Sequence, residues 1–249
     1  MADTAGHEKR MPFLDHLEEL RKKLLVTLFF FLAATVAAFI FIEPIMTFLE
    51  LPIDGYGLTL HYFKPHEKFF TYVKTAVFTG LVATVPFLIV QVGLFVSPAL
   101  KSKEKRVFNL ILFFLVLLFA GGCFFAYTAI APTAFRFFIG FAAEDGVLPV
   151  WGIGAYYEVL FKVVFFIGLA FELPLILLFT VAVDILSVRA LARGRKIALL
   201  VSFIFGAVLT PPDLFTQILV GSILYILYEV TILAAKLISR KRKRIHEYV

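Results

Sequence analysis

The sequence predicts an all-α integral membrane protein with six membrane-spanning helices, and three observations lead to this prediction. The chain of 249 residues is 61% hydrophobic with a mean hydropathy of +0.94, and only 17% of its residues are charged. A soluble domain has about 25% charged residues and could not bury this much apolar surface. The apolar segments are continuous and about 20 residues long, without the alternation of barrel strands, so they are predicted to be helices.

Polar connectors, several with Gly or Pro, separate six apolar segments. The predicted spans are residues 23–42, 69–96, 107–131, 155–183, 197–209 and 214–235. The fifth segment makes only about 20 Å of helix, which is shorter than the ~30 Å hydrocarbon core of a bilayer. Such a span requires local thinning of the bilayer or shielding by neighbouring helices. No internal repeat supports an inverted-repeat transporter, and residues 1–249 are expected to form a single membrane domain.

The positions of lysine and arginine predict that both termini face the cytoplasm. These bases gather in the N-terminal tail, in the connectors 97–106 and 184–196, and in the tail 236–249. The net charge of +6 is therefore attributed to membrane orientation, and no nucleic-acid partner is expected. In the outward connectors, Trp151, Tyr156 and Tyr157 are typical of an interfacial aromatic belt. Residues 133–142 are expected to form a short amphipathic helix lying on the outer surface.

The segment DHLEELRKKLL, residues 15–25, places carboxylates where the cytoplasmic end of a membrane helix normally collects bases. On a helical wheel Phe13, Leu17, Leu20 and Leu24 share one face, and Asp15, Glu18, Glu19 and Lys22 share the opposite one. The carboxylates could simply form i,i+4 pairs, Glu18 with Lys22 and Glu19 with Lys23, each worth about 0.2–0.5 kcal/mol. Alternatively, they could receive a cationic ligand, for which the forked guanidinium of arginine is best suited.

A second cytoplasmic acid, Glu104, lies among four bases in the segment 91–106, where Pro98 is expected to end the second span. A solvated loop with a local ion pair is the simple alternative for Glu104.

The fourth and sixth spans each contain a carboxylate. Glu172 lies near the middle of its span, where an acidic group costs roughly 2.5–3.5 kcal/mol on insertion scales. Pro174 removes the helical partner of the Ala170 carbonyl, so a kink is expected there. Glu172 could make a structural interhelical hydrogen bond or could contact a ligand or partner. Glu229 is the second intramembrane carboxylate.

The segment LTPPDLFTQ, residues 209–217, is expected to be a helix boundary. Pro211 and Pro212 end the fifth helix, and Asp213 can cap the sixth. Gln217 then remains as an intramembrane polar residue.

An enzyme is not expected, because no G-x-S-x-G, H-E-x-x-H or P-loop motif is present. The lone Cys123 is interpreted as a small apolar packing residue. No metal site or cofactor is expected.

Four motifs, in order along the chain, carry a resemblance to a known family. They are PFLDHLEELRKKLL (12–25), QVGLFVSPALKSKEKR (91–106), FELP (171–174) and LTPPD (209–213). Together they resemble TatC, the polytopic subunit of the twin-arginine protein translocase. The resemblance implies that twin-arginine signal peptides bind at Glu19, Arg21, Phe95 and Glu104. It matches Glu172 to the family's intramembrane acid, and Gln91, Asp213 and Gln217 to other motif positions.

The resemblance also implies a cupped bundle with short fifth and sixth helices. Partners would be single-span TatA- and TatB-type subunits and further TatC copies, with transport driven by the proton gradient and no cofactor. A prokaryotic plasma membrane is the expected location. The alternative hypothesis is a proton-coupled small-solute transporter that uses Glu172 and Glu229 as a relay. An intramembrane hydrolase has no visible nucleophile–base pair.

Overall fold

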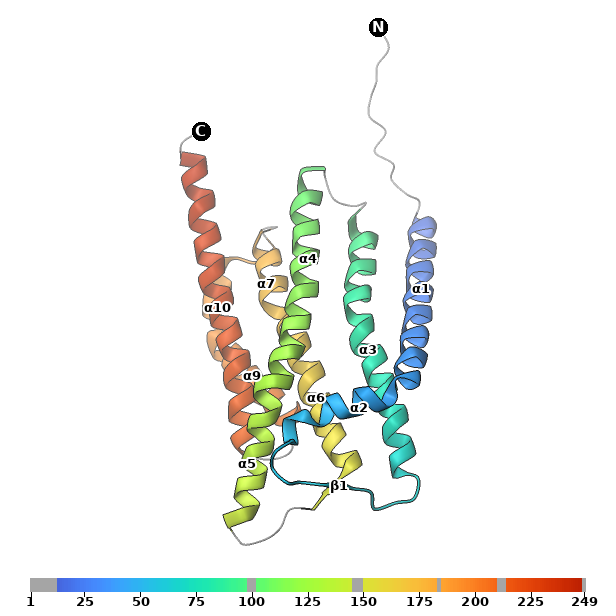
Figure 1. The fold of residues 1–249 in the computed structure, drawn as a ribbon. Helices are drawn as coiled ribbons and strands as arrows, with labels where there is room; N and C mark the ends of the chain where they lie inside the picture. The colour runs from blue at the N-terminus through green and yellow to red at the C-terminus, as the bar shows by residue number, and fades with distance from the viewer. Residues whose placement is uncertain (1–12, 98–101, 145–149, 183–184, 210–213, 248–249) are drawn as a thin grey trace.

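The computed structural model describes residues 13–97, 102–144, 150–182, 185–209 and 214–247, and this part of the chain is almost entirely helical (Figure 1). The α-helices are α1 (Phe13–Ile40), α2 (Ile42–Glu50), α3 (Glu67–Val96), α4 (Ser102–Phe125), α5 (Ala131–Glu144), α6 (Ile153–Ala170), α7 (Leu173–Ala182), α8 (Val188–Arg193), α9 (Arg195–Leu209) and α10 (Leu214–Glu247). A short 3-10 helix, η1 (Leu51–Ile53), follows α2, and a π-helix, η3 (Ala126–Ile130), joins α4 to α5. Strands β1 (Leu60–His61) and β2 (Trp151–Gly152) pair in parallel, with Leu60 opposite Trp151.

Five helical stretches among the described residues are long and apolar enough to cross a membrane. They are His16–Ile40, Glu67–Val96, Phe108–Phe141, Ile153–Val181 and Leu214–Leu237. The predicted fifth span corresponds to α9, which has 15 residues and is therefore short, as expected. The prediction of a short sixth helix is wrong, because α10 has 34 residues. After Gly221 this helix meets no further Gly or Pro, so the basic tail continues it instead of ending it.

Residues 133–142 do form a helix, but the prediction that they lie on the outer surface as a separate element is wrong. The π-helix η3 passes directly into α5, so the third span continues without a break to Glu144 (Figure 1). Pro132 falls in the first turn of α5, and a π-turn before a proline is one way to accommodate the missing N–H. Phe135 is 2% exposed and packs against Trp151 and Tyr156, so this face meets protein.

The fourth span is broken where the sequence predicts. Helix α6 ends at Ala170 and α7 begins at Leu173, so Phe171 and Glu172 lie between them. Pro174 supplies no amide proton to the Ala170 carbonyl, which explains the break. The largest group of buried residues is centred on α6, including Leu160 and Ile167.

The first connector, residues 43–68, is more structured than predicted, because it contains α2 and η1. Tyr157 donates hydrogen bonds to the Met46 carbonyl at 3.3 Å and to Glu50 Oε1 at 2.9 Å, and Tyr156 donates to the Leu49 carbonyl at 2.6 Å. Both tyrosines are buried, so the prediction that they belong to an interfacial belt is wrong. Their hydroxyl groups instead bind α2 to α6.

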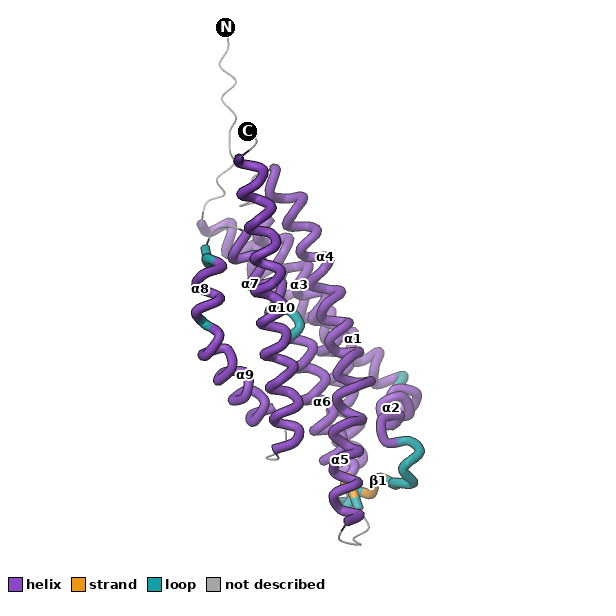
Figure 2. The backbone as a smooth tube through the Cα atoms, turned by 90° about the vertical axis from the view of Figure 1, so that its left-hand side faces the viewer, coloured by secondary structure: helices purple, strands orange, loops and turns teal. Residues whose placement is uncertain are grey.

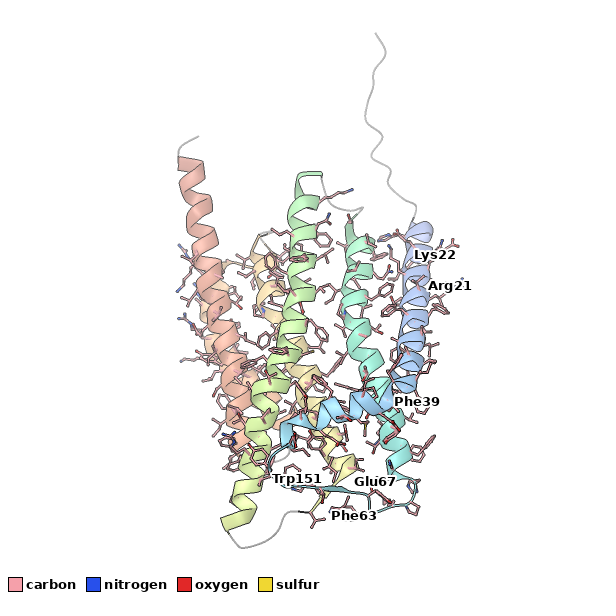
Figure 3. All side chains as sticks on the ribbon, viewed as in Figure 1. Arg21, Lys22, Phe39, Phe63, Glu67 and Trp151 are labelled. Atoms are coloured by element: carbon pink, nitrogen blue, oxygen red, sulfur yellow. The ribbon has the colours of Figure 1, made fainter. Side chains whose placement is uncertain are left out.

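Glu67, the first residue of α3, holds the start of α6. Its Oε1 accepts from the Gly154 amide at 3.2 Å, and its Oε2 accepts from the Phe63 amide at 2.8 Å and the Lys64 amide at 3.3 Å. Figure 3 places Glu67, Phe63 and Trp151 close together at this end of the molecule. The carboxylate therefore satisfies the Gly154 amide, which α6 itself cannot pair, and two amides of the segment before α3.

Candidate functional site

Helices α1 and α3 pack along each other and position the N-terminal candidate residues. Their backbones approach closely at Gly80, where an added Cβ atom would lie 2.9 Å from the Thr35 amide nitrogen. Phe30 and Phe87 stack with ring centroids 4.4 Å apart. This packing brings the start of α1 beside the end of α3 (Figure 1).

At this junction the imidazole of His16 stacks flat on the ring of Phe95. The ring centroids are 4.1 Å apart and the planes differ by 11°. Gln91 lies one helical turn before Phe95 on α3 and is half-buried, so both residues belong to the same side of that helix.

The Glu19 carboxylate lies beside this stack and is only partly paired. Its Oε1 is 3.3 Å from Lys23 Nζ, which confirms the predicted i,i+4 pair. Its Oε2 is 3.9 Å from His16 Nδ1, which is beyond hydrogen-bond distance. This oxygen is buried and has no hydrogen-bond partner among the described residues. A buried acceptor in this state costs about 1–3 kcal/mol. The structure therefore places Glu19 and Phe95 on either side of His16 and leaves one buried carboxylate oxygen without a donor among the described residues.

Two polar side chains of this part of α1, Glu19 and Lys23, turn toward the protein, whereas Glu18 and Lys22 are exposed. The side chains of Glu19 and Lys23 are 26% and 19% exposed, whereas Leu17 and Leu24 are 46% and 53% exposed. In a bilayer the lipid solvates the apolar side, so the polar side can pack against a neighbouring helix. Arg21 and Lys22 are exposed and project from α1 near its start (Figure 3). Arg21 thus points away from the cluster of Glu19, His16 and Phe95.

Several predicted site residues lie outside the part of the chain that the structure describes. Pro211, Pro212 and Asp213 belong to the segment 210–213, which is not described. Glu104 lies in the first helical turns of α4, but its side chain is outside the described part.

Glu172 is buried at 6% exposure in the break between α6 and α7. Neither of its carboxyl oxygens makes a hydrogen bond of standard geometry within the described residues, although the carboxyl group lies near the backbone amide of Phe119 in α4. Nearby, α4 and α6 approach closely, because a Cβ atom at Gly168 would lie 2.5 Å from Cys123 Sγ. This contact agrees with the interpretation of Cys123 as a packing residue.

Glu229 has two partners. Its Oε1 is 2.8 Å from Arg195 Nε and accepts a 2.9 Å hydrogen bond from Tyr225, and its Oε2 accepts from Arg195 Nη2 at 3.0 Å. A carboxylate held in this way is poorly suited to a proton relay with Glu172. Gln217 donates from Nε2 to the Phe203 carbonyl at 3.4 Å and so helps to join α10 to α9.

Comparisons with known proteins agree with these motifs and this fold. A model of the family described as Sec-independent protein translocase protein (TatC) matches residues 15–222. This chain belongs to the TatC family. It is 34% identical over 238 residues to the Sec-independent protein translocase protein TatC of Desulforapulum autotrophicum, covering 94% of this chain and 88% of the relative. It is 33% identical over 240 residues to that of Aquifex aeolicus, covering 95% and 100%.

A solved structure leads to the same family. The crystal structure of the twin-arginine translocase receptor TatC matches with a TM-score of 0.80 and 32% identity, covering 89% of this chain and 98% of that one. The protein is therefore a multi-pass membrane protein and a TatC-type component of the Sec-independent protein translocase.

This TatC chain also has an apolar cavity of about 590 Å³ between its last helices. Leu169 and Leu173 of α6 and α7, Val201 of α9 and Leu224 of α10 are among its lining residues. Figure 2 shows α9 on one side of the molecule, and Ile197, Val201 and Phe205 of this helix line the cavity. The short helix α9 therefore forms one wall of this cavity.

Sequence reasoning missed two residues of this TatC chain that lie beside the candidate carboxylates. His16 precedes Glu19 by three residues, a helical spacing that could have identified it. Arg195 is separated from Glu229 by 34 positions, and no local pattern connects them.

Proposed function

We propose that this chain is the receptor subunit that binds signal peptides with paired arginines at its cytoplasmic face. Glu19 and Glu104 would receive the two guanidinium groups, and Phe95 would pack against the residues around them. The observation that carries this proposal is the Glu19 carboxylate beside the imidazole that stacks on Phe95, with Oε2 buried and without a hydrogen-bond partner among the described residues.

The chemistry of arginine fits this site better than that of lysine. A guanidinium is planar, donates two parallel N–H bonds to one carboxylate and stacks on aromatic rings, whereas an ammonium acts as a compact point charge. Arg21 remains a predicted contact, because its exposed side chain is accessible to a bound peptide.

We further propose six spans, with α9 as the short fifth, and both termini in the cytoplasm. The start of α1 and the end of α10 lie at the same end of the bundle, as expected for an even number of crossings (Figure 1). The end of α3 and the start of α4 lie there too, so Glu104 and Phe95 would share the face of Glu19. The bases of the connectors 97–106 and 184–196 support this orientation.

In this proposal the chain forms a single membrane domain in a prokaryotic plasma membrane. Helices α6, α7, α9 and α10 would form a concave wall for the apolar part of the signal peptide and for single-span TatA- and TatB-type partners. Glu172 would be a polar contact in this region, and Gln91 and Gln217 would support it. Assemblies with further TatC copies would export folded cargo with the proton gradient, and the chain itself would need no cofactor and catalyse no reaction.

Charge reversal tests the assignment of the two carboxylates. The double variant Glu19→Lys, Glu104→Lys should abolish export of a reporter with a twin-arginine signal, because the site would then repel guanidinium groups. Export of a Sec-dependent reporter should be unchanged. The matched control is Glu18→Lys, since Glu18 is the exposed neighbour of Glu19 on the same helix. Normal twin-arginine export by the double variant would refute these roles.

A binding experiment tests the ligand directly. The full chain in lipid nanodiscs should crosslink to a signal peptide with Arg-Arg and should lose this crosslink when the pair is Lys-Lys. Equal crosslinking of both peptides would contradict recognition of the guanidinium.

A further inference from the structure

His16 has a geometry that its position in the sequence does not explain. It is a polar, partly exposed side chain, 40% exposed, yet its ring lies flat on Phe95 of another helix with planes only 11° apart. Its Nδ1 faces the Glu19 carboxylate at 3.9 Å without reaching hydrogen-bond distance. The imidazole therefore covers Phe95 and faces Glu19, but it leaves Oε2 of Glu19 without a hydrogen bond among the described residues.

An arginine of a bound peptide would need the same space. Imidazole and guanidinium are both flat groups with N–H donors in the plane, and both stack on aromatic rings. The guanidinium differs because it has a fork of donors that can engage a whole carboxylate edge. The space over Phe95 is consequently suited to a guanidinium and is filled by a group that satisfies Glu19 less well.

We propose that His16 is an internal substitute for the signal arginine, which must displace the imidazole from Phe95 in order to bind. This inference rests on the proposed function and adds a specificity step to it. The arriving group must replace the stacking on Phe95 and also supply the hydrogen bond that Glu19 Oε2 lacks. A guanidinium does both, whereas a lysine ammonium cannot replace the flat stacking. The displacement of His16 therefore lowers the binding free energy of a ligand that stacks poorly more than it lowers that of arginine.

Affinity measurements on His16 variants test this proposal. Binding of a fluorescent peptide with Arg-Arg to the full chain in nanodiscs should be about 2- to 10-fold tighter for His16→Ala, because no stacked ring has to be displaced. His16→Arg should weaken binding by about tenfold or more, because a resident guanidinium would pair with Glu19 permanently. The preference for Arg-Arg over Lys-Lys should decrease in His16→Ala.

The chain contains a matched control. His66 also contacts a phenylalanine, Phe70, with centroids 5.5 Å apart, but edge-on and at the start of α3. His66→Ala should leave peptide affinity unchanged. If His16→Ala binds the peptide equally or more weakly, His16 is not a competitor, and the proposal is overturned.

Proton NMR can detect the displacement of the His16 ring without any substitution at His16. The stacked imidazole protons should be shifted upfield in proton NMR by the Phe95 ring current, and Phe95→Ala should remove this shift. Addition of the Arg-Arg peptide should move the signal toward that of an unstacked histidine. An unchanged signal in the saturated complex would overturn displacement while leaving the receptor function intact. If the wild-type chain does not prefer Arg-Arg to Lys-Lys, the receptor function and the role of His16 both fail.

Discussion

Gly206 of α9 lies directly against the backbone of Gln217 in α10. A Cβ atom at Gly206 would come within 2.7 Å of the Gln217 carbonyl oxygen. The two helices also approach at Gly221, where a Cβ atom would lie 3.1 Å from the Phe203 ring. Because α9 is too short to cross a bilayer alone, this close packing on α10 is what holds it in place.

Gly206→Ala should therefore separate α9 from α10 and lower the free energy of unfolding by about 1–3 kcal/mol, the usual cost of overpacking. Reversible unfolding in bicelles would measure the change. Gly121→Ala is the matched control, because nothing lies within 4 Å of a Cβ atom at Gly121 in α4. That variant should be neutral or slightly stabilising, and equal losses for both would contradict the packing argument.

Glu67→Ala should loosen the start of α6, because the amides of Phe63, Lys64 and Gly154 would lose their acceptor. Hydrogen exchange at the Phe63 and Gly154 amides should become about fivefold faster. Mass spectrometry or NMR of the exchanging amides would measure it. Glu158→Ala provides the comparison, since that carboxylate pairs with Lys162 on the same helix and contacts neither amide. Unchanged amide exchange rates in Glu67→Ala would contradict the role of Glu67 as the acceptor for these amides.

The pair Arg195–Glu229 should contribute a coupling energy of about 1–2 kcal/mol, between the values for exposed and buried ion pairs. A double-mutant cycle with Arg195→Ala and Glu229→Ala, followed by unfolding in bicelles, would give this energy. The exposed pair Lys162–Glu158, 2.7 Å apart on one helix, should give at most about 0.5 kcal/mol. A larger coupling energy for Lys162–Glu158 than for Arg195–Glu229 would contradict this prediction.

Glu172→Leu should stabilise the protein by about 1–3 kcal/mol and at the same time lower export. Its two oxygens are buried without partners among the described residues, so an apolar side chain removes a desolvation cost. Thermal unfolding in detergent and export of a twin-arginine reporter would be measured together. Glu172→Gln, which keeps a polar head group, should retain more export than Glu172→Leu. Loss of stability with normal export would instead indicate a structural role.

The sequence predicted the long apolar helices well. The second span, expected at 69–96, is α3 (Glu67–Val96), and the break near Glu172 follows from Pro174. Continuous apolar runs and proline act locally, so both can be read without knowledge of the neighbours.

The direction of burial could not be predicted in the same way. The helical wheel groups Glu19 with Glu18 and Lys22, yet the structure turns Glu19 and Lys23 inward and leaves Glu18 and Lys22 exposed. Lipid is as apolar as leucine, so hydrophobicity does not distinguish a protein contact from a lipid contact. The helix α2 was also missed, although Ile42, Met46 and Leu49 have helical spacing, because nearby prolines indicated a connector.

The continuation of α10 beyond its apolar span sets how far the C-terminal backbone reaches from the membrane-spanning part. The apolar span ends at Leu237, and the helix continues to Glu247. Those ten residues add about 15 Å of rigid length, which is about twice the Debye length in physiological salt. Electrostatic attraction to lipid head groups decays over that distance, so the backbone of α10 extends beyond the range of the membrane's surface charge.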